Sequence, residues 1–282
     1  MKKLMKVMIV LLLIGFFVVF AIRWLEKRMI YFPAKFPEGY WDTSQLPGRI
    51  EECLFRTEDG IRLHGWFFHA LLPQDVQRKP VRTMLFFHGN GGNLTYWAPY
   101  IAALTRLGVN VLIVDYRGYG KSEGAPDEQG LYADALAAYN YLLSRTDVHK
   151  EHIIIFGQSL GGAVAVDLAT KRPCEKLILE ATFTSIKEMT KTMFGVLPVH
   201  SLLNTKFDSL AKIKTLHVPL LSIHGNRDTI VPFELGKRLF AAANEPKIFY
   251  EIPGADHNNT AEVGGSAYFA RLAQFLQTDF AR

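Results

Sequence analysis

The chain has 282 residues, of which 49% are hydrophobic and 21% are charged. This is an ordinary globular composition, and it excludes a disordered or low-complexity protein. The 32 basic and 27 acidic residues leave a net charge of +5 that is not gathered into one basic run, so no nucleic acid is expected as a partner. Two cysteines, Cys53 and Cys174, are too few for a disulfide framework or a Cys-rich zinc site. We interpret both as buried apolar side chains.

The N-terminus carries one long apolar segment. Val7–Ile22 is uncharged, and as a helix its sixteen residues rise about 24 Å, against about 30 Å for the hydrocarbon core of a bilayer. Apolar residues just outside it lengthen the span, so we expect residues 1–30 to be a single-pass membrane anchor. The alternative is a cleavable signal peptide with its cut at Val19-Phe20-Ala21. Basic residues flank the segment equally, so the sequence does not predict on which side of the membrane residues 31–282 lie.

Residues 31–49 are rich in Pro, Gly and aromatic residues and are predicted to be a linker. Extended apolar runs then alternate with helical patterns through residues 50–282. The expected strands, the first two joined by a hairpin at Glu58-Asp59-Gly60, are Glu51–Arg56, Ile61–His69, Arg82–His88, Val109–Asp115, His152–Gly157, Lys176–Ala181, Pro219–His224 and Lys247–Ile252. The expected helices lie near Leu94–Leu107, Asp127–Arg145, Leu160–Lys171 and Gly265–Phe280, and a further helix starts after Val231-Pro232.

This alternation predicts one domain of the α/β class, with a mainly parallel sheet covered by helices on both faces. The expected strands are apolar throughout, as in strands buried on both faces. One long irregular stretch, about 183–218, is expected to be a small cap insertion. Together with the anchor, its apolar residues favour an acyl-chain substrate; the alternative is that they belong to the core. They are Met193, Phe194, Val196, Leu197, Leu202 and Leu203.

The motif Gly157-Gln158-Ser159-Leu160-Gly161 has the pattern G-x-S-x-G and lies between an expected strand and an expected helix. Such a turn holds the serine in a strained backbone conformation, and the glycines on either side remove side chains that would clash. The serine then projects above the end of the strand. We therefore predict that Ser159 is a nucleophile.

A serine nucleophile needs a base and a carboxylate that orients the base, and in this architecture they occur in the order Ser, acid, His. Four histidines lie downstream, and His257, in a loop after the last strand, is the predicted base. His224 ends a strand and is interpreted as a packed structural residue, while His200 and His217 belong to the cap region and its exit. Asp228 comes directly after an expected strand and is the predicted acid. Its alternatives are Asp208, Glu251 and Asp256.

Two backbone N–H groups are expected to bind the oxyanion that forms on attack. One is the amide of Leu160, directly after the nucleophile. The other comes from the glycine-rich loop His88-Gly89-Asn90-Gly91-Gly92-Asn93, and we favour the Asn90 amide with Gly91 as the alternative.

The segment Asp115-Tyr116-Arg117-Gly118-Tyr119-Gly120-Lys121-Ser122 invites a phosphate-loop interpretation. It fails, because Asp115 occupies the position of the first glycine of a Walker A motif, and Glu123 occupies that of the last glycine of a dinucleotide fingerprint. Asp115 and Arg117 are instead expected to be either a structural ion pair or a loop-shaping pair beside the site. The chain has no H-E-x-x-H or C-x-x-C pattern, so the sequence gives no support for metal catalysis.

Taken together, the motifs around His88, Asp115, Ser159, Asp228 and His257 resemble, in order and spacing, those of the α/β-hydrolase superfamily. The anchor followed by Met29-Ile30-Tyr31-Phe32-Pro33 is similar to its membrane-anchored branch near protein depalmitoylases, monoacylglycerol lipases and serine aminopeptidase-type hydrolases. The resemblance implies an eight-stranded sheet whose second strand is antiparallel, and an acyl-enzyme mechanism without a cofactor. It places the catalytic triad on Ser159, Asp228 and His257.

We therefore expect a membrane-anchored serine hydrolase that cleaves carboxylic esters or thioesters, with a small-molecule or lipid acyl ester as substrate. One alternative is a serine aminopeptidase-like enzyme, which uses the same triad on amides. The other is a non-catalytic, membrane-tethered binding protein, although a binding module needs no strained nucleophile. Dehalogenase or epoxide hydrolase chemistry would require an aspartate in place of Ser159.

Overall fold

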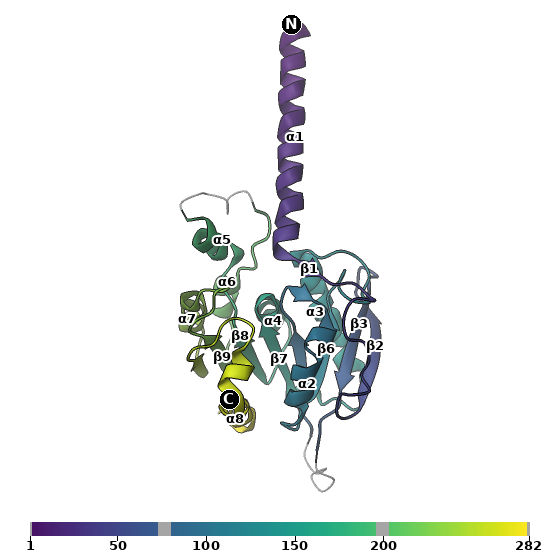
Figure 1. Ribbon diagram of the computed structural model, residues 1–282, viewed down its shortest axis with the longest axis vertical. Helices are drawn as coiled ribbons and strands as arrows, with labels where there is room; N and C mark the ends of the chain where they lie inside the picture. Colours follow the sequence, from purple (N-terminus) through teal and green to yellow (C-terminus); the bar gives the residue numbers. More distant parts are fainter. Residues whose placement is uncertain (1, 73–79, 196–202, 281–282) are drawn as a thin grey trace.

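The computed structural model describes residues 2–72, 80–195 and 203–280. Helix α1 (Lys2–Ile30) is continuous and extends away from the rest of the chain (Figure 1). Its apolar side chains are mostly exposed, and within the described residues it is the one helix long and apolar enough to cross a membrane. Length and composition of this kind fit a signal sequence as well as an anchor.

Eight strands form one sheet in the order β10-β9-β8-β7-β4-β6-β3-β2. Their bounds are Ile50–Arg56 for β2, Arg62–Phe68 for β3, Thr83–Phe87 for β4, Asn110–Asp115 for β6, Ile153–Gln158 for β7, Lys176–Glu180 for β8, Leu220–Gly225 for β9 and Lys247–Ile252 for β10. Strand β3 is antiparallel to both β2 and β6, and every other pairing in the sheet is parallel. This confirms the expected α/β-hydrolase sheet and its antiparallel second strand.

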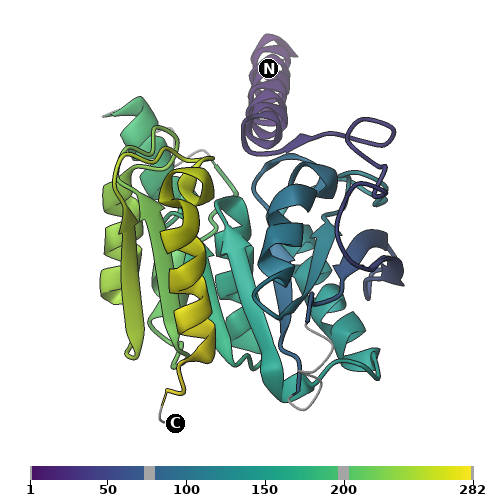
Figure 2. The same cartoon turned by 60° about the horizontal axis from the view of Figure 1, so that its bottom comes forward.

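Helices cover both faces of this sheet (Figure 2). On β4, Leu85 and Phe87 pack with α3 (Glu128–Ser144), α4 (Leu160–Lys171) and α7 (Phe233–Ala242). Met84 and Phe86 point the other way, because successive side chains of a strand alternate between its faces. They pack with α2 (Ala98–Thr105) and α8 (Thr260–Gln277). The parallel strands from β6 to β9 are therefore buried on both sides, whereas β10, at the edge of the sheet, is mostly half-buried.

Two helices differ from their expected bounds. The helix predicted near Leu94–Leu107 is a 3-10 turn, η1 (Leu94–Tyr96), followed by α2. Pro99 lies in the first turn of α2, and since proline has no N–H it favours a helix start there over a helix that runs through. The last helix begins at Thr260 rather than at Gly265, where a φ of +53° breaks its regular geometry. A second 3-10 turn, η2 (Lys150–His152), precedes β7.

The expected cap region contains α5 (Ile186–Phe194) and α6 (Ser209–Ile213). Of the apolar residues that suggested an acyl substrate, Val196, Leu197 and Leu202 lie outside the described residues, as do the side chains of Met193 and Phe194. Leu203 is half-buried against the core.

The stretch after α1 lies along the domain. Within it, β1 (Phe32–Pro33) pairs in parallel with β5 (Gly91–Gly92), forming a two-stranded sheet separate from the main one. The loop 89–93 is thereby joined to the end of the N-terminal helix.

Candidate active site

Three loops at the carboxyl ends of parallel strands bring the predicted residues together. Ser159 comes after β7, Asp228 after β9 and His257 after β10. The Oγ atom of Ser159 lies 3.0 Å from Nε2 of His257, and Nδ1 of His257 lies 2.8 Å from Oδ2 of Asp228. An ionised carboxylate only accepts, so we assign the ring proton to Nδ1, which leaves Nε2 to accept the Ser159 proton. All three side chains are almost fully buried.

Ser159 has a φ of +53° and a ψ of −117°, a conformation that L-residues rarely adopt. Backbone atoms also pack closely against Gly157 and Gly161, the glycines two residues before and two residues after Ser159. A Cβ atom on Gly157 would lie 2.2 Å from the Gly161 carbonyl oxygen, and one on Gly161 would lie 2.0 Å from that of Phe87. Both glycines are therefore required by the turn, for the steric reason that the sequence indicated.

The carboxylate of Asp228 is completely buried, and burial alone would raise its pKa. The hydrogen bonds from His224 and His257 and the charge of His257 outweigh burial and hold the pKa of this carboxyl well below its usual range. Its Oδ1 atom accepts from the backbone N–H groups of Ile230 and Val231. The acid is thus held ionised and in a fixed orientation toward His257.

The alternatives to these residues have other roles. Asp208 caps α6, Glu251 accepts from Asn226, and Asp256 accepts from the backbone N–H groups of Thr229 and His257. Of the two remaining histidines, His217 is exposed, and His200 lies outside the described residues.

The predicted oxyanion donors lie on either side of Ser159. Leu160 is the first residue of α4, where N–H groups have no partner inside the helix. Across from it, a Cβ on Gly89 would lie 3.7 Å from the Cβ of Ser159, so the loop of Asn90 runs beside the serine. Within the described residues the Asn90 N–H donates to no other backbone group. Gly91, the alternative, is part of β5.

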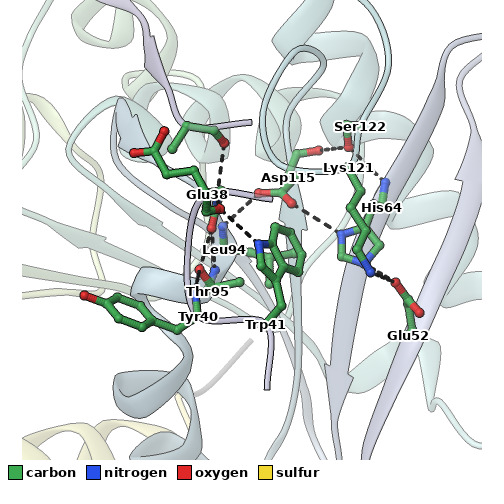
Figure 3. Close-up of polar contacts among 12 residues, drawn as sticks. Glu38, Tyr40, Trp41, Glu52, His64, Leu94, Thr95, Asp115, Lys121 and Ser122 are labelled. Atoms are coloured by element: carbon green, nitrogen blue, oxygen red, sulfur yellow. Dashed lines mark hydrogen bonds and ion pairs between the residues drawn. The ribbon is translucent and has the colours of Figure 1, made fainter. Parts of the chain in front are cut away.

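Asp115 and Arg117 do not form an ion pair with each other, so that alternative is wrong. Arg117 donates to Asp134 at 2.8 Å and to Asp59 at 2.8 Å, because it faces α3 and the β2–β3 turn. Asp115 instead accepts from the Leu94 N–H at 2.7 Å and lies 3.3 Å from Nδ1 of His64 (Figure 3). It therefore fixes the start of η1, directly after the loop of Asn90.

Two cavities meet at Ser159. One, of about 420 Å³, has a mixed lining, and we call it the polar cavity because its walls include Glu38, Asn90, Gln158, His257 and Asn258. The other, of about 430 Å³, is mainly apolar. Its apolar lining residues are Met29, Ile30, Phe32, Leu160, Phe183, Ile186, Met189, Leu203, Ile230 and Val231.

Sequence reasoning missed a buried carboxylate next to the turn that carries Ser159. Glu180 ends β8, and its carboxylate accepts from Thr260 at 2.6 Å, from Gln158 at 3.2 Å and from the Tyr268 hydroxyl. Burial raises the pKa of Glu180 although these hydrogen bonds oppose the rise. Its backbone oxygen accepts from the Ser159 N–H at 2.8 Å, so it supports the turn. Within the sequence Glu180 is one more polar residue at a strand end, a weak signal by itself.

Comparisons with known proteins place this fold and site in a family. A family model described as serine aminopeptidase, S33, matches residues 78–212. The protein bem46 of Schizosaccharomyces pombe is 36% identical over 267 residues, which cover 89% of this chain and 85% of that protein. The α/β hydrolase domain-containing protein WAV2 of Arabidopsis thaliana is 37% identical over 278 residues, covering 89% and 87%. The chain therefore belongs to the α/β-hydrolase superfamily.

A solved structure supports the same fold. An esterase from Pyrococcus furiosus superposes with a TM-score of 0.70 and 22% identity over 88% of this chain and 97% of that one. At 22% identity this similarity shows a shared fold and no more. Family and fold together define the protein as a hydrolase.

Proposed function

We propose that the protein is a membrane-anchored serine hydrolase that cleaves esters or thioesters of acyl chains. The observation that carries the proposal is the hydrogen-bonded line from Ser159 through His257 to Asp228, next to the backbone amides of Leu160 and Asn90. This arrangement activates a hydroxyl for attack and binds the negative charge that attack creates.

The reaction proceeds in two steps. His257 Nε2 takes the proton of Ser159 as Oγ attacks the substrate carbonyl, and Asp228 stabilises the charged imidazole. The amides of Leu160 and Asn90 bind the oxyanion until the tetrahedral intermediate collapses; His257 then protonates the departing alcohol or thiol. Water, deprotonated by His257, attacks the acyl-enzyme and releases the acid and free Ser159.

The apolar cavity supports an acyl chain as the group bound to Ser159. Its walls come from the end of α1, the cap region and the loop after β9, and they expose few polar groups. The polar cavity on the other side of Ser159 suits a hydrated leaving group. Helix α1, with its exposed apolar side chains, would keep this site at a membrane.

A fluorophosphonate probe tests the nucleophile in the full-length protein. We expect the wild type and a Ser44→Ala control to be labelled, and Ser159→Ala and His257→Ala not to be. Hydrolysis of p-nitrophenyl esters of rising chain length should then show an optimum at long chains. A preference for acetate and butyrate esters would contradict the acyl-chain part of the proposal.

A second candidate is hydrolysis of aminoacyl amides, which the family description favours. The carboxylate of Glu38 in the polar cavity provides a charge for a substrate ammonium group. Turnover of aminoacyl p-nitroanilides that exceeds turnover of esters would support this candidate. A folded wild type that is not labelled would favour the tethered binding protein.

A further inference from the structure

The segment that leaves helix α1, Ile30–Ala34, is hydrogen-bonded to the loop that carries Asn90. The Phe32 N–H donates to the Asn90 carbonyl at 2.9 Å, and the Ala34 N–H donates to the Gly92 carbonyl at 2.9 Å. The side-chain amide of Asn90 donates to the Ile30 carbonyl at 2.8 Å. We refer to Ile30–Ala34 as the helix-exit segment.

These bonds engage the carbonyl and the side-chain nitrogen of Asn90. The carbonyl accepts from Phe32 and also from the Tyr119 hydroxyl at 2.8 Å, and the side-chain nitrogen donates to Ile30. Asn90 lines the same cavity as Ser159, and its N–H donates to no backbone group within the described residues, so it is the backbone group of Asn90 left for a ligand in that cavity. The contacts thus select the orientation that an oxyanion donor requires.

The loop that carries Asn90 has no other pairing with a described β-strand. Its strand β5 pairs only with β1 among the described strands, and neither belongs to the eight-stranded sheet. A pair of two-residue strands is too small to be stable alone. The placement of Asn90 therefore depends on where α1 ends.

The last turns of α1 also hold the opposite wall of the apolar cavity. Glu26 accepts from the backbone N–H groups of Asn204 and Thr205 at 2.9 and 2.6 Å. Met29, Ile30 and Leu203 line the cavity beside these contacts. The end of one helix thus contacts both the oxyanion loop and the chain that returns from the cap.

We propose that the helix-exit segment positions the Asn90 amide for oxyanion binding, which makes the Asn90 side chain and the Phe32 N–H positioning groups. The inference rests on the proposed function, and it makes the N-terminal helix a part of the catalytic structure in addition to an anchor. Loss of either bond would let the Asn90 peptide turn away from the oxyanion, with the nucleophile and base unchanged.

The test uses full-length protein in detergent micelles with Asn90→Ala and Asn90→Asp, which remove the donor to Ile30 but keep the backbone amide. Since loss of one oxyanion donor costs about 10²–10³ in rate, we expect kcat to fall about 10- to 100-fold when that donor is displaced. KM should stay within about twofold, and the affinity for a boronic acid analogue of the tetrahedral intermediate should fall by the same factor as kcat. Phe32→Pro, which removes the other donor, should show the same pattern.

Asn244→Ala is the matched control. Its side chain donates to the backbone carbonyls of Lys214 and Leu216, away from the site, so the variant loses comparable bonds and should keep kcat and analogue affinity. If the Asn90 variants keep the kcat and analogue affinity of the wild type, the inference is overturned. The proposed function would still stand in that case, provided that the wild type hydrolyses esters. A rise in KM alone would also overturn it. A wild type without labelling or hydrolysis would overturn both.

Discussion

The Nε2 atom of His224 lies 3.1 Å from the Oδ2 atom of Asp228, the same oxygen that faces the proposed base. Nε2 also lies 3.0 Å from the Val231 carbonyl, so one N–H is shared between two acceptors. The ring is confined on its other side, where a Cβ on Gly236 would lie 2.1 Å from Nδ1. His224 is therefore a packed residue, as expected, but one that also contacts the proposed triad.

Replacing His224 with leucine should lower kcat about tenfold or more. A hydrogen bond to a charged group contributes about 1.5–3 kcal/mol, and its loss frees the carboxylate that orients His257. Ester hydrolysis at constant pH measures the effect, with the exposed His217→Leu as control. A kcat within twofold of the wild type would show that the backbone N–H groups of Ile230 and Val231 hold Asp228 by themselves.

Asp228→Asn should lower kcat by about 10⁴, the loss seen when the acid of a serine triad becomes an amide. It should also destabilise the fold in a pH-dependent way. The pKa of Asp228 is lower in the folded state, so its stabilising contribution is present above the unfolded pKa of about 3.9 and is lost as the pH falls through the folded value. Thermal unfolding of the wild type and Asp228→Asn from pH 8 to 3 should show a difference in Tm between the two proteins that becomes smaller only below about pH 4. A Tm difference that already becomes smaller near pH 6 would contradict the lowered pKa of Asp228.

Gly157→Ala should abolish labelling and destabilise the fold at the upper end of single substitutions, about 4–5 kcal/mol. The added Cβ would meet a backbone oxygen at 2.2 Å, which no side-chain rotation relieves. Gly15→Ala in α1, where nothing lies within 4 Å of the new atom, is the control. Urea unfolding and probe labelling are the measurements, and a stable, labelled Gly157→Ala protein would be inconsistent with the turn around Ser159.

Tyr268→Phe should lower the free energy of unfolding by about 1–3 kcal/mol, because the buried carboxylate of Glu180 loses one donor. The Tyr100 hydroxyl, 2.6 Å from that of Tyr268, loses a partner as well. Labelling of the folded variant should persist, since Thr260 and Gln158 still hold Glu180. Tyr40→Phe, on an exposed ring, is the control, and equal stability of the two variants would mean that water replaces the lost donor.

Local patterns were enough to predict the strands and the three residues that the structure brings together. Ser159, Asp228 and His257 each come after an apolar run, and parallel strands place their carboxyl ends at one edge. Contacts between segments that are distant in the sequence have no comparable local pattern from which they could be predicted. The partners of Arg117 are Asp59 and Asp134, which depend on how α3 packs rather than on residue spacing.

The pairing of β1 with β5 could not be predicted for the same reason. Phe32 and Asn90 are joined by a backbone hydrogen bond, which any residue except proline can donate, so side-chain identity carries no sign of it. The 3-10 turn before α2 was hidden by the continuous apolar pattern around it.

The length of α1 has a consequence for where the reaction takes place. Its 29 residues rise about 44 Å, roughly 14 Å more than the hydrocarbon core of a bilayer. When the proposed anchor is inserted, its uncharged segment Val7–Ile22 lies in the core, so the turns that follow, which include Trp24 and Met29, stand among the lipid headgroups. The cavity lined by Met29 opens at that depth. A lipid or an acylated protein whose carbonyl lies among the headgroups then meets Ser159 without its chain being drawn out through water.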